Sequence, residues 1–159
     1  MANVTFIYVG SLKEDYLRAA VAEYKKRLSQ YARVDEVEIK EERISDESNI
    51  AQITKAINTE GEKILTAIPT GAYKVALCIE GTQYSSEGLS KIIESACDTH
   101  GKLAFIIGSS HGLSDTVKKS ADLKLSFSKL TFPHQLMRVI LLETVYRSFS
   151  IIHGGKYHK

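Results

Sequence analysis

Short apolar segments alternate with segments of helical periodicity along this chain, and this alternation limits its possible folds more than any other feature. The apolar segments are nearly continuous, which is typical of strands covered on both faces. Strands that alternate with helices predict an α/β fold, with a mostly parallel sheet and helices on both sides. The predicted strands are residues 4–9, 34–39, 74–79, 103–107 and 123–127. The predicted helices are residues 15–30, 46–68, 85–99, 114–121 and 133–152.

Size and composition predict one domain over residues 1–159. Hydrophobic residues make up 43% of the chain and charged residues 25%, as in ordinary globular proteins. No apolar run is long enough to cross a membrane, and the first residues lack the apolar core of a signal peptide, so we expect a cytoplasmic protein. Cys78 and Cys97 lack metal-ligand spacing, which predicts reduced thiols and no metal site.

Charge is distributed unevenly along the chain. Residues 1–101 contain 12 Lys and Arg against 16 Asp and Glu, whereas residues 102–159 contain 9 against 3. Four of the five histidines also lie in the second part. A positive field of this kind favours a polyanionic partner such as RNA, although a solvated basic surface would give the same pattern.

The predicted helix at residues 133–152 is apolar nearly all the way round. A helix on the surface of a domain needs only one apolar stripe, so this one must be covered on two sides. In a small domain, a second subunit is a natural cover, which predicts a homodimer. The alternative is a central helix within a monomer.

Two loops of the predicted sheet have the composition of ligand sites. One is the polar segment 127–132, which lies between a strand end and Pro133 at a helix start. The other is Gly108-Ser109-Ser110-His111-Gly112, whose glycines allow the backbone to turn sharply and approach a ligand closely. In open α/β sheets, ligands bind at the carboxyl ends of the strands, where both loops are expected. The loop that follows Leu77-Cys-Ile-Glu-Gly81 is expected beside them.

The same five residues match the G-x-S-x-G pattern of α/β-hydrolases, with Ser110 as the nucleophile. A hydrolase would also need a later acid and a later histidine. Asp122 with His134 or His158 satisfies that order. Short motifs of this kind occur often by chance, so a serine hydrolase stays a minor alternative.

Several motifs together resemble the large-subunit rRNA methyltransferase H family, which belongs to the SPOUT, or trefoil-knot, superfamily. The longest is Phe127-Ser-Lys-Leu-Thr-Phe-Pro-His-Gln-Leu-Met-Arg138, and the resemblance extends from end to end of the chain. Further matching segments are Val9-Gly-Ser-Leu-Lys-Glu14, Tyr24-Lys-Lys-Arg-Leu28, Ser85-Ser-Glu-Gly-Leu89, Leu113-Ser-Asp115, Tyr146-Arg147 and Tyr157-His-Lys159.

The resemblance implies a knotted α/β homodimer that binds S-adenosylmethionine with three loops. The positions that match the family's cofactor loops are Leu77, Gly108, Phe127, Ser128, Lys129, Leu130, Thr131 and Phe132. It also implies that the methyl group goes to N3 of a pseudouridine in large-subunit ribosomal RNA, within the assembled ribosome.

Three residues are the catalytic candidates on the substrate side. An imide N–H must lose its proton before it attacks a methyl group, which calls for a nearby base or cation. We expect Tyr157 to stack on the base, His158 to move the proton, and Arg138 to hold a phosphate or polarise a base carbonyl. The main alternative of another class is a noncatalytic module that binds RNA or the ribosome and has no need of the loop glycines.

The chain departs from the family pattern at two positions. Ser109 stands where a second glycine is usual, and His153 stands where the tail usually has an arginine. The first puts a side chain where the backbone is expected to approach the cofactor. The second removes a phosphate contact unless Lys156 replaces it.

Overall fold

The computed structural model describes all residues from Met1 to Lys159. Its strands are β1 (Ala2–Val9), β2 (Ala32–Ile39), β3 (Tyr73–Thr82), β4 (Lys102–Ile107) and β5 (Leu123–Leu125). Its helices are α1 (Asp15–Leu28), α2 (Ile50–Ala67), α3 (Ser86–His100), α4 (Asp115–Ser120) and α5 (His134–Ile152). The predicted alternation of strands and helices is therefore confirmed in type and order.

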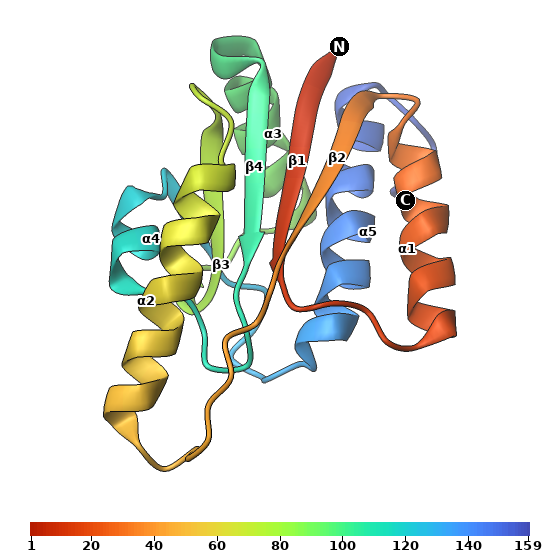
Figure 1. Ribbon diagram of the computed structural model, residues 1–159. Helices are drawn as coiled ribbons and strands as arrows, with labels where there is room; N and C mark the ends of the chain where they lie inside the picture. Colours follow the sequence, from red (N-terminus) through yellow and green to blue (C-terminus); the bar gives the residue numbers. More distant parts are fainter.

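The five strands form one sheet in the order β2-β1-β4-β3-β5, and every neighbouring pair is parallel. All carboxyl ends therefore lie at one edge, at the bottom of Figure 1. The central strands β1 and β4 are buried almost throughout, as their continuous apolar sequences predict.

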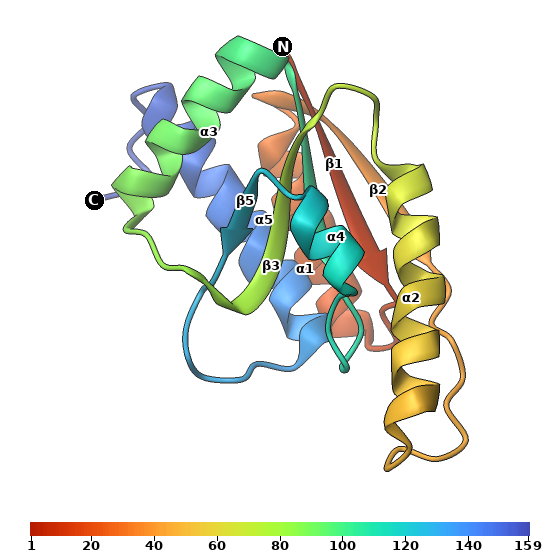
Figure 2. The same cartoon turned by 90° about the vertical axis from the view of Figure 1, so that its left-hand side faces the viewer.

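Helices cover both faces of the sheet, as Figures 1 and 2 show. On one face, Phe6 and Phe105 pack with apolar residues of α1, α3 and α5 in the larger core. On the other face, Ile7 and Ile106 pack with Ile64 of α2 and Val117 of α4 in a smaller core. Alternate residues of one strand thus serve opposite cores, because successive side chains point to opposite faces.

Helix α5 lies between α1 and α3 against the sheet (Figures 1 and 2). Its buried residues include Leu141, Leu142, Val145 and Phe149, all part of the larger core. The second cover that its apolar sequence requires is therefore supplied within one chain. The all-round apolar character of α5 does not by itself call for a partner subunit.

Some helix ends differ from the sequence expectation. Helix α2 begins at Ile50 rather than at residue 46, because the Asn49 side chain accepts a hydrogen bond from the Gln52 N–H and caps the helix there. Pro133 is the residue before α5 rather than its first residue. Ser114 caps α4 as predicted, accepting from the Val117 N–H. None of the helices is both long enough and apolar enough to span a membrane.

Candidate ligand-binding site

A cavity of about 760 Å³ opens at the carboxyl edge of the sheet, and we call it the loop cavity. Its walls come from the end of β3, the loop between β4 and α4, and the segment between β5 and α5. Seven of the eight residues predicted to bind a cofactor line it: Leu77, Gly108, Phe127, Ser128, Leu130, Thr131 and Phe132. Lys129 is exposed and does not line the cavity.

The loop after β4 is a tight turn built on its glycines. Ser109 and Gly112 form an isolated antiparallel bridge, and Gly112 has a φ of 90°. A Cβ atom on Gly108 would lie 2.6 Å from the Gly112 carbonyl oxygen and 2.9 Å from Leu113 Cδ2. Gly108 is therefore required so that the loop can close on itself, which shapes this wall of the cavity.

The segment after β5 is held by its own serines. The buried Ser126 donates from Oγ to the Ser128 carbonyl at 3.2 Å, and the Leu130 N–H donates to Ser128 Oγ at 3.0 Å. The Ser126 N–H also donates to the Thr82 carbonyl at 3.0 Å. These bonds give a fixed shape to a segment without regular secondary structure, while most of its other polar backbone groups stay available to a ligand.

The cavity is also lined by residues that the sequence did not single out as ligand residues. Lys118 and Glu80 line the cavity and form an ion pair at 2.6 Å. The hydrogen bond from Lys118 lowers the pKa of Glu80. Met137, on the first turns of α5, and Cys78, whose pKa is raised by burial, complete an apolar side. Cys78 and Glu80 follow the predicted cofactor residue Leu77 in β3, so their position in the sequence is the signal that could have identified them.

A buried carboxylate supports the loop after β4 from outside the cavity. Glu60 of α2 is 3% exposed, and its Oε2 accepts the Glu42 N–H at 2.9 Å. Burial raises the pKa of Glu60, while the Glu42 N–H and the Ser109 hydroxyl act in the opposite direction. The serine that departs from the family pattern is thus turned toward α2. Ser109 also lines the loop cavity.

Replacing Glu60 by Gln should stabilise the protein at neutral pH and not at acidic pH. Folding raises the pKa of Glu60 above its ordinary value of 4.5. The ionised carboxylate therefore destabilises the folded protein at a pH above the folded-state pKa, and this destabilisation is absent below pH 4.5. Glutamine keeps an oxygen that accepts the Glu42 N–H. Urea unfolding of both proteins at pH 4 and pH 8 checks this, and a variant less stable than wild type at pH 8 would contradict it.

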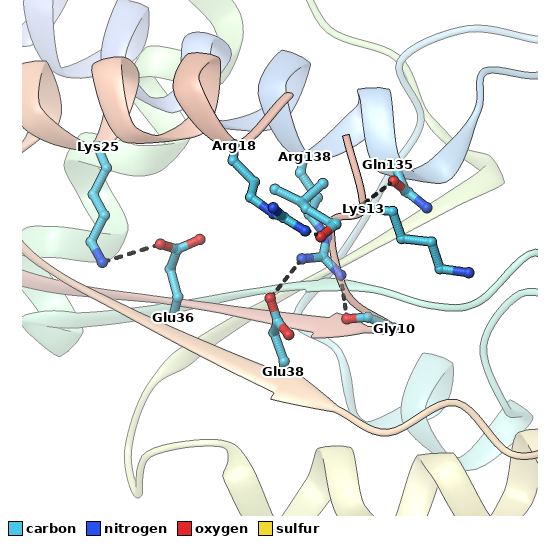
Figure 3. A network of polar contacts seen from close by, with 9 residues as sticks. Gly10, Lys13, Arg18, Lys25, Glu36, Glu38, Gln135 and Arg138 are labelled. Atoms are coloured by element: carbon cyan, nitrogen blue, oxygen red, sulfur yellow. Dashed lines mark hydrogen bonds and ion pairs between the residues drawn. The ribbon is translucent and has the colours of Figure 1, made fainter. Parts of the chain in front are cut away.

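Arg138 does not reach the loop cavity. Its side chain is 2% exposed, its Nη1 donates to Glu38 at 3.2 Å, and its Nη2 donates to the Gly10 carbonyl. Figure 3 shows the guanidinium held between these two partners. The guanidinium carbon of Arg138, Cζ, also lies 4.3 Å from the centre of the Tyr8 ring. In this conformation, the guanidinium fastens α5 to the ends of β1 and β2 and is not free to hold a phosphate.

The C-terminal tail folds back along α5. The Tyr157 hydroxyl donates to Glu143 at 3.0 Å, and its ring packs edge-on against Tyr146 at 4.7 Å. His158 contacts Glu87 of α3 at 2.8 Å. Glu143 lies six positions after the cavity residue Met137, or roughly 9 Å along the helix axis. The tail is therefore near the loop cavity without lining it.

The structure does not assemble a hydrolase triad. Ser110 is exposed and lines the loop cavity at the carboxyl edge. Asp122 lies at the other edge of the sheet, where it accepts the Lys74 N–H at 2.8 Å. His158 is engaged by Glu87 and Arg147. The order of these residues along the chain fits a hydrolase, but the parallel sheet separates the acid from the serine, so the hydrolase interpretation is wrong.

The fold and the site together define a class of protein. A parallel sheet covered on both faces, with a ligand-sized cavity at the carboxyl ends of its strands, is typical of α/β enzymes that bind a small organic molecule. No group of three or more His, Cys, Asp or Glu side chains is placed to hold a metal ion.

Sequence comparison identifies the family. The profile of a family described as "Predicted SPOUT methyltransferase" matches residues 2–158. The chain is 49% identical over 156 residues to "Ribosomal RNA large subunit methyltransferase H" of Caldicellulosiruptor bescii, covering 98% of this chain and 99% of the relative. It is 47% identical over 159 residues to the protein of the same name from Shouchella clausii, covering 99% of both. The chain belongs to the SPOUT methyltransferase family.

Solved structures support the fold at low sequence identity. A probable methyltransferase from Bordetella pertussis Tohama I matches with a TM-score of 0.59 and 10% identity, over 93% of this chain and 95% of that one. A probable methylase family protein from Haemophilus influenzae Rd KW20 matches with a TM-score of 0.55 and 10% identity, over 99% and 71%. The arrangement of strands and helices is therefore one that methyltransferases use.

Proposed function

We propose that this protein is an S-adenosylmethionine-dependent methyltransferase that acts on large-subunit ribosomal RNA, at N3 of a pseudouridine. The observation that carries the proposal is the loop cavity, where the family's cofactor positions gather from three separate segments. Relatives that share nearly half of the sequence over almost their whole length are named as methyltransferases of this RNA. The basic bias of residues 102–159 suits a polyanionic substrate.

The residues around the loop cavity fit the proposed cofactor. A volume of about 760 Å³ lies within the usual range of small-molecule sites. Leu77, Leu125 and Met137 offer an apolar surface to an adenine ring, while the tight turn at Gly108 brings backbone groups to the cavity wall. When bound, S-adenosylmethionine supplies a methyl group that its sulfonium already makes electrophilic, so the protein needs mainly to position the acceptor.

On the substrate side, the tail residues remain the candidates for the proton and the base. His158 has a pair of contacts, to Glu87 and Arg147, that hold its ring in one orientation. Burial raises the pKa of Tyr157, so its phenol stays protonated and serves as a stacking surface rather than a base. For Arg138 we propose a positioning role, because its guanidinium is occupied by Glu38 and the Gly10 carbonyl.

We further propose that the protein is a cytoplasmic homodimer and that its chain is knotted around the three cofactor loops, as the family resemblance implies. Two leucines near the loop cavity are exposed, Leu130 at 71% and Leu136 at 38%. Leu130 lines the cavity, and Leu136 precedes the lining residue Met137 in the sequence. Apolar side chains exposed together at a site support a subunit interface there. Sedimentation equilibrium should give twice the 17.7 kDa chain mass. A protein that stays monomeric at high micromolar concentration would refute the dimer.

Calorimetric titration with S-adenosylmethionine separates the candidate functions. A methyltransferase should bind the cofactor with a stoichiometry of about one per chain or one per dimer, and the demethylated product should compete. A noncatalytic RNA-binding module would bind ribosomes but neither ligand. If wild type gives no heat and no thermal shift with millimolar cofactor, the enzyme proposal fails.

A further inference from the structure

A second cavity, of about 510 Å³, lies beside the loop cavity, and we call it the polar cavity. It is formed at the carboxyl ends of β1 and β2 and at the first residues of α5, and Ile39 is its only hydrophobic lining residue. His134 lines both cavities. The two cavities therefore follow one another along the same edge of the sheet, where His134 stands between them.

The walls of the polar cavity are fixed by internal contacts. Arg138 lies behind them and binds both Glu38 and the Gly10 carbonyl, which are wall residues (Figure 3). The Lys13 N–H donates to Gln135 Oε1 at 3.3 Å and ties the loop after β1 to α5. These contacts join β1, β2 and α5 to one another, so the polar cavity is already formed without a ligand.

The charges at the polar cavity favour an anion. Lys13 and Lys40 line it, both residues are exposed, and the ammonium group of neither forms an ion pair or a hydrogen bond within the chain. In Figure 3 no dashed line joins the Lys13 ammonium to a neighbour. Arg138 already neutralises Glu38, which leaves Glu41 as the one unpaired carboxylate facing two unpaired lysines.

We propose that the polar cavity holds the ribose-phosphate of an RNA nucleotide next to the methylated base. This rests on the proposed function, since it assumes that the acceptor base enters the loop cavity. A strand that places one base there must continue past His134, and a free lysine is a good point-charge partner for a phosphate. Polar side chains and backbone groups suit a ribose hydroxyl, which donates and accepts hydrogen bonds.

The test compares a double variant, Lys13→Ala with Lys40→Ala, with the control Lys102→Ala. Lys102 is also an exposed lysine, but it lies at the amino end of β4, on the opposite edge of the sheet. The substrate is assembled ribosomes from cells that lack this protein. Removal of one lysine that binds a phosphate should reduce the salt slope of RNA binding by about one.

For the double variant we expect a KM for ribosomes about tenfold higher and a logarithmic salt slope lower by about one, because the polar cavity holds one phosphate. Its kcat and its affinity for S-adenosylmethionine should match wild type, because these lysines do not touch the reacting atoms. The control should match wild type throughout. Thermal unfolding shows that all variants are folded, which the exposure of the three lysines leads us to expect.

Three outcomes would overturn the polar cavity as an RNA subsite. One is a double variant with unchanged KM and salt slope, and another is a control whose RNA binding weakens as much as that of the double variant. The third is weaker cofactor binding by the double variant, which would assign the polar cavity to the donor. Wild type that transfers no methyl group at all refutes the proposed function instead, so the two failures are distinguishable.

Discussion

Gly108→Ala should weaken binding of S-adenosylmethionine by about 30-fold, or about 2 kcal/mol. The new Cβ would lie 2.6 Å from the Gly112 carbonyl oxygen and 2.8 Å from its carbon. Both are backbone atoms, so the loop has to open. Because this loop forms one wall of the loop cavity, opening it displaces the groups that face the cofactor. The effect does not require the new methyl group to touch the ligand itself.

The matched control is Gly71→Ala. Gly71 has a φ of 80° and no atom within 4 Å of an added Cβ, so alanine there costs backbone strain without a clash. Gly71 lies in the turn before β3, at the edge of the sheet opposite the loop cavity. Calorimetry should show wild-type affinity for the control even where its melting temperature falls. If Gly108→Ala binds as tightly as the control, the loop cavity is not the donor site.

Deleting Tyr157–Lys159 should reduce methyl transfer about 100-fold or more, the usual contribution of a general acid or base. Cofactor affinity should change little, because none of the deleted residues lines the loop cavity. The deletion should also destabilise the fold by about 1–2 kcal/mol, since it removes the packing of Tyr157 against Tyr146 and its hydrogen bond to Glu143.

Point variants separate the two tail residues. His158→Ala should lower the rate more near neutral pH than at alkaline pH, where solvent can take the imide proton. Tyr157→Phe keeps the ring against Tyr146 and should be mild if stacking is its role. Lys159→Ala, at an exposed position, is the control and should match wild type. Equal methyl incorporation by the truncated and intact proteins would remove the tail from the active site.

The fold could be predicted from the sequence because its periodicities are strong. Apolar runs such as residues 103–107 have the composition of strands buried on both faces, and every predicted helix is present. Helix ends were less certain, because side chains such as Asn49 decide them locally. The sequence led us to expect a second subunit as the second cover of α5, because periodicity shows that a helix is buried but not which neighbour buries it. The structure supplies that cover from α1 and α3.

Most of the residues predicted to bind a cofactor line the loop cavity, because the carboxyl ends of parallel strands meet at one edge. Contacts between distant segments were not predictable. Nothing in the sequence near Arg138 indicates that Glu38 and Gly10, about one hundred residues or more earlier, hold its guanidinium. The polar cavity was missed for the same reason, as its walls come from three separate segments without a shared motif.

The most direct test of the central claim is methyl transfer itself. Assembled ribosomes from cells without this protein are incubated with the purified enzyme and S-adenosylmethionine that carries a labelled methyl group. The account predicts label in large-subunit RNA, on N3 of a single pseudouridine, with Gly108→Ala slower by about threefold or more at cofactor concentrations that just saturate wild type. Wild-type enzyme that binds the cofactor but leaves ribosomal RNA unlabelled would contradict it.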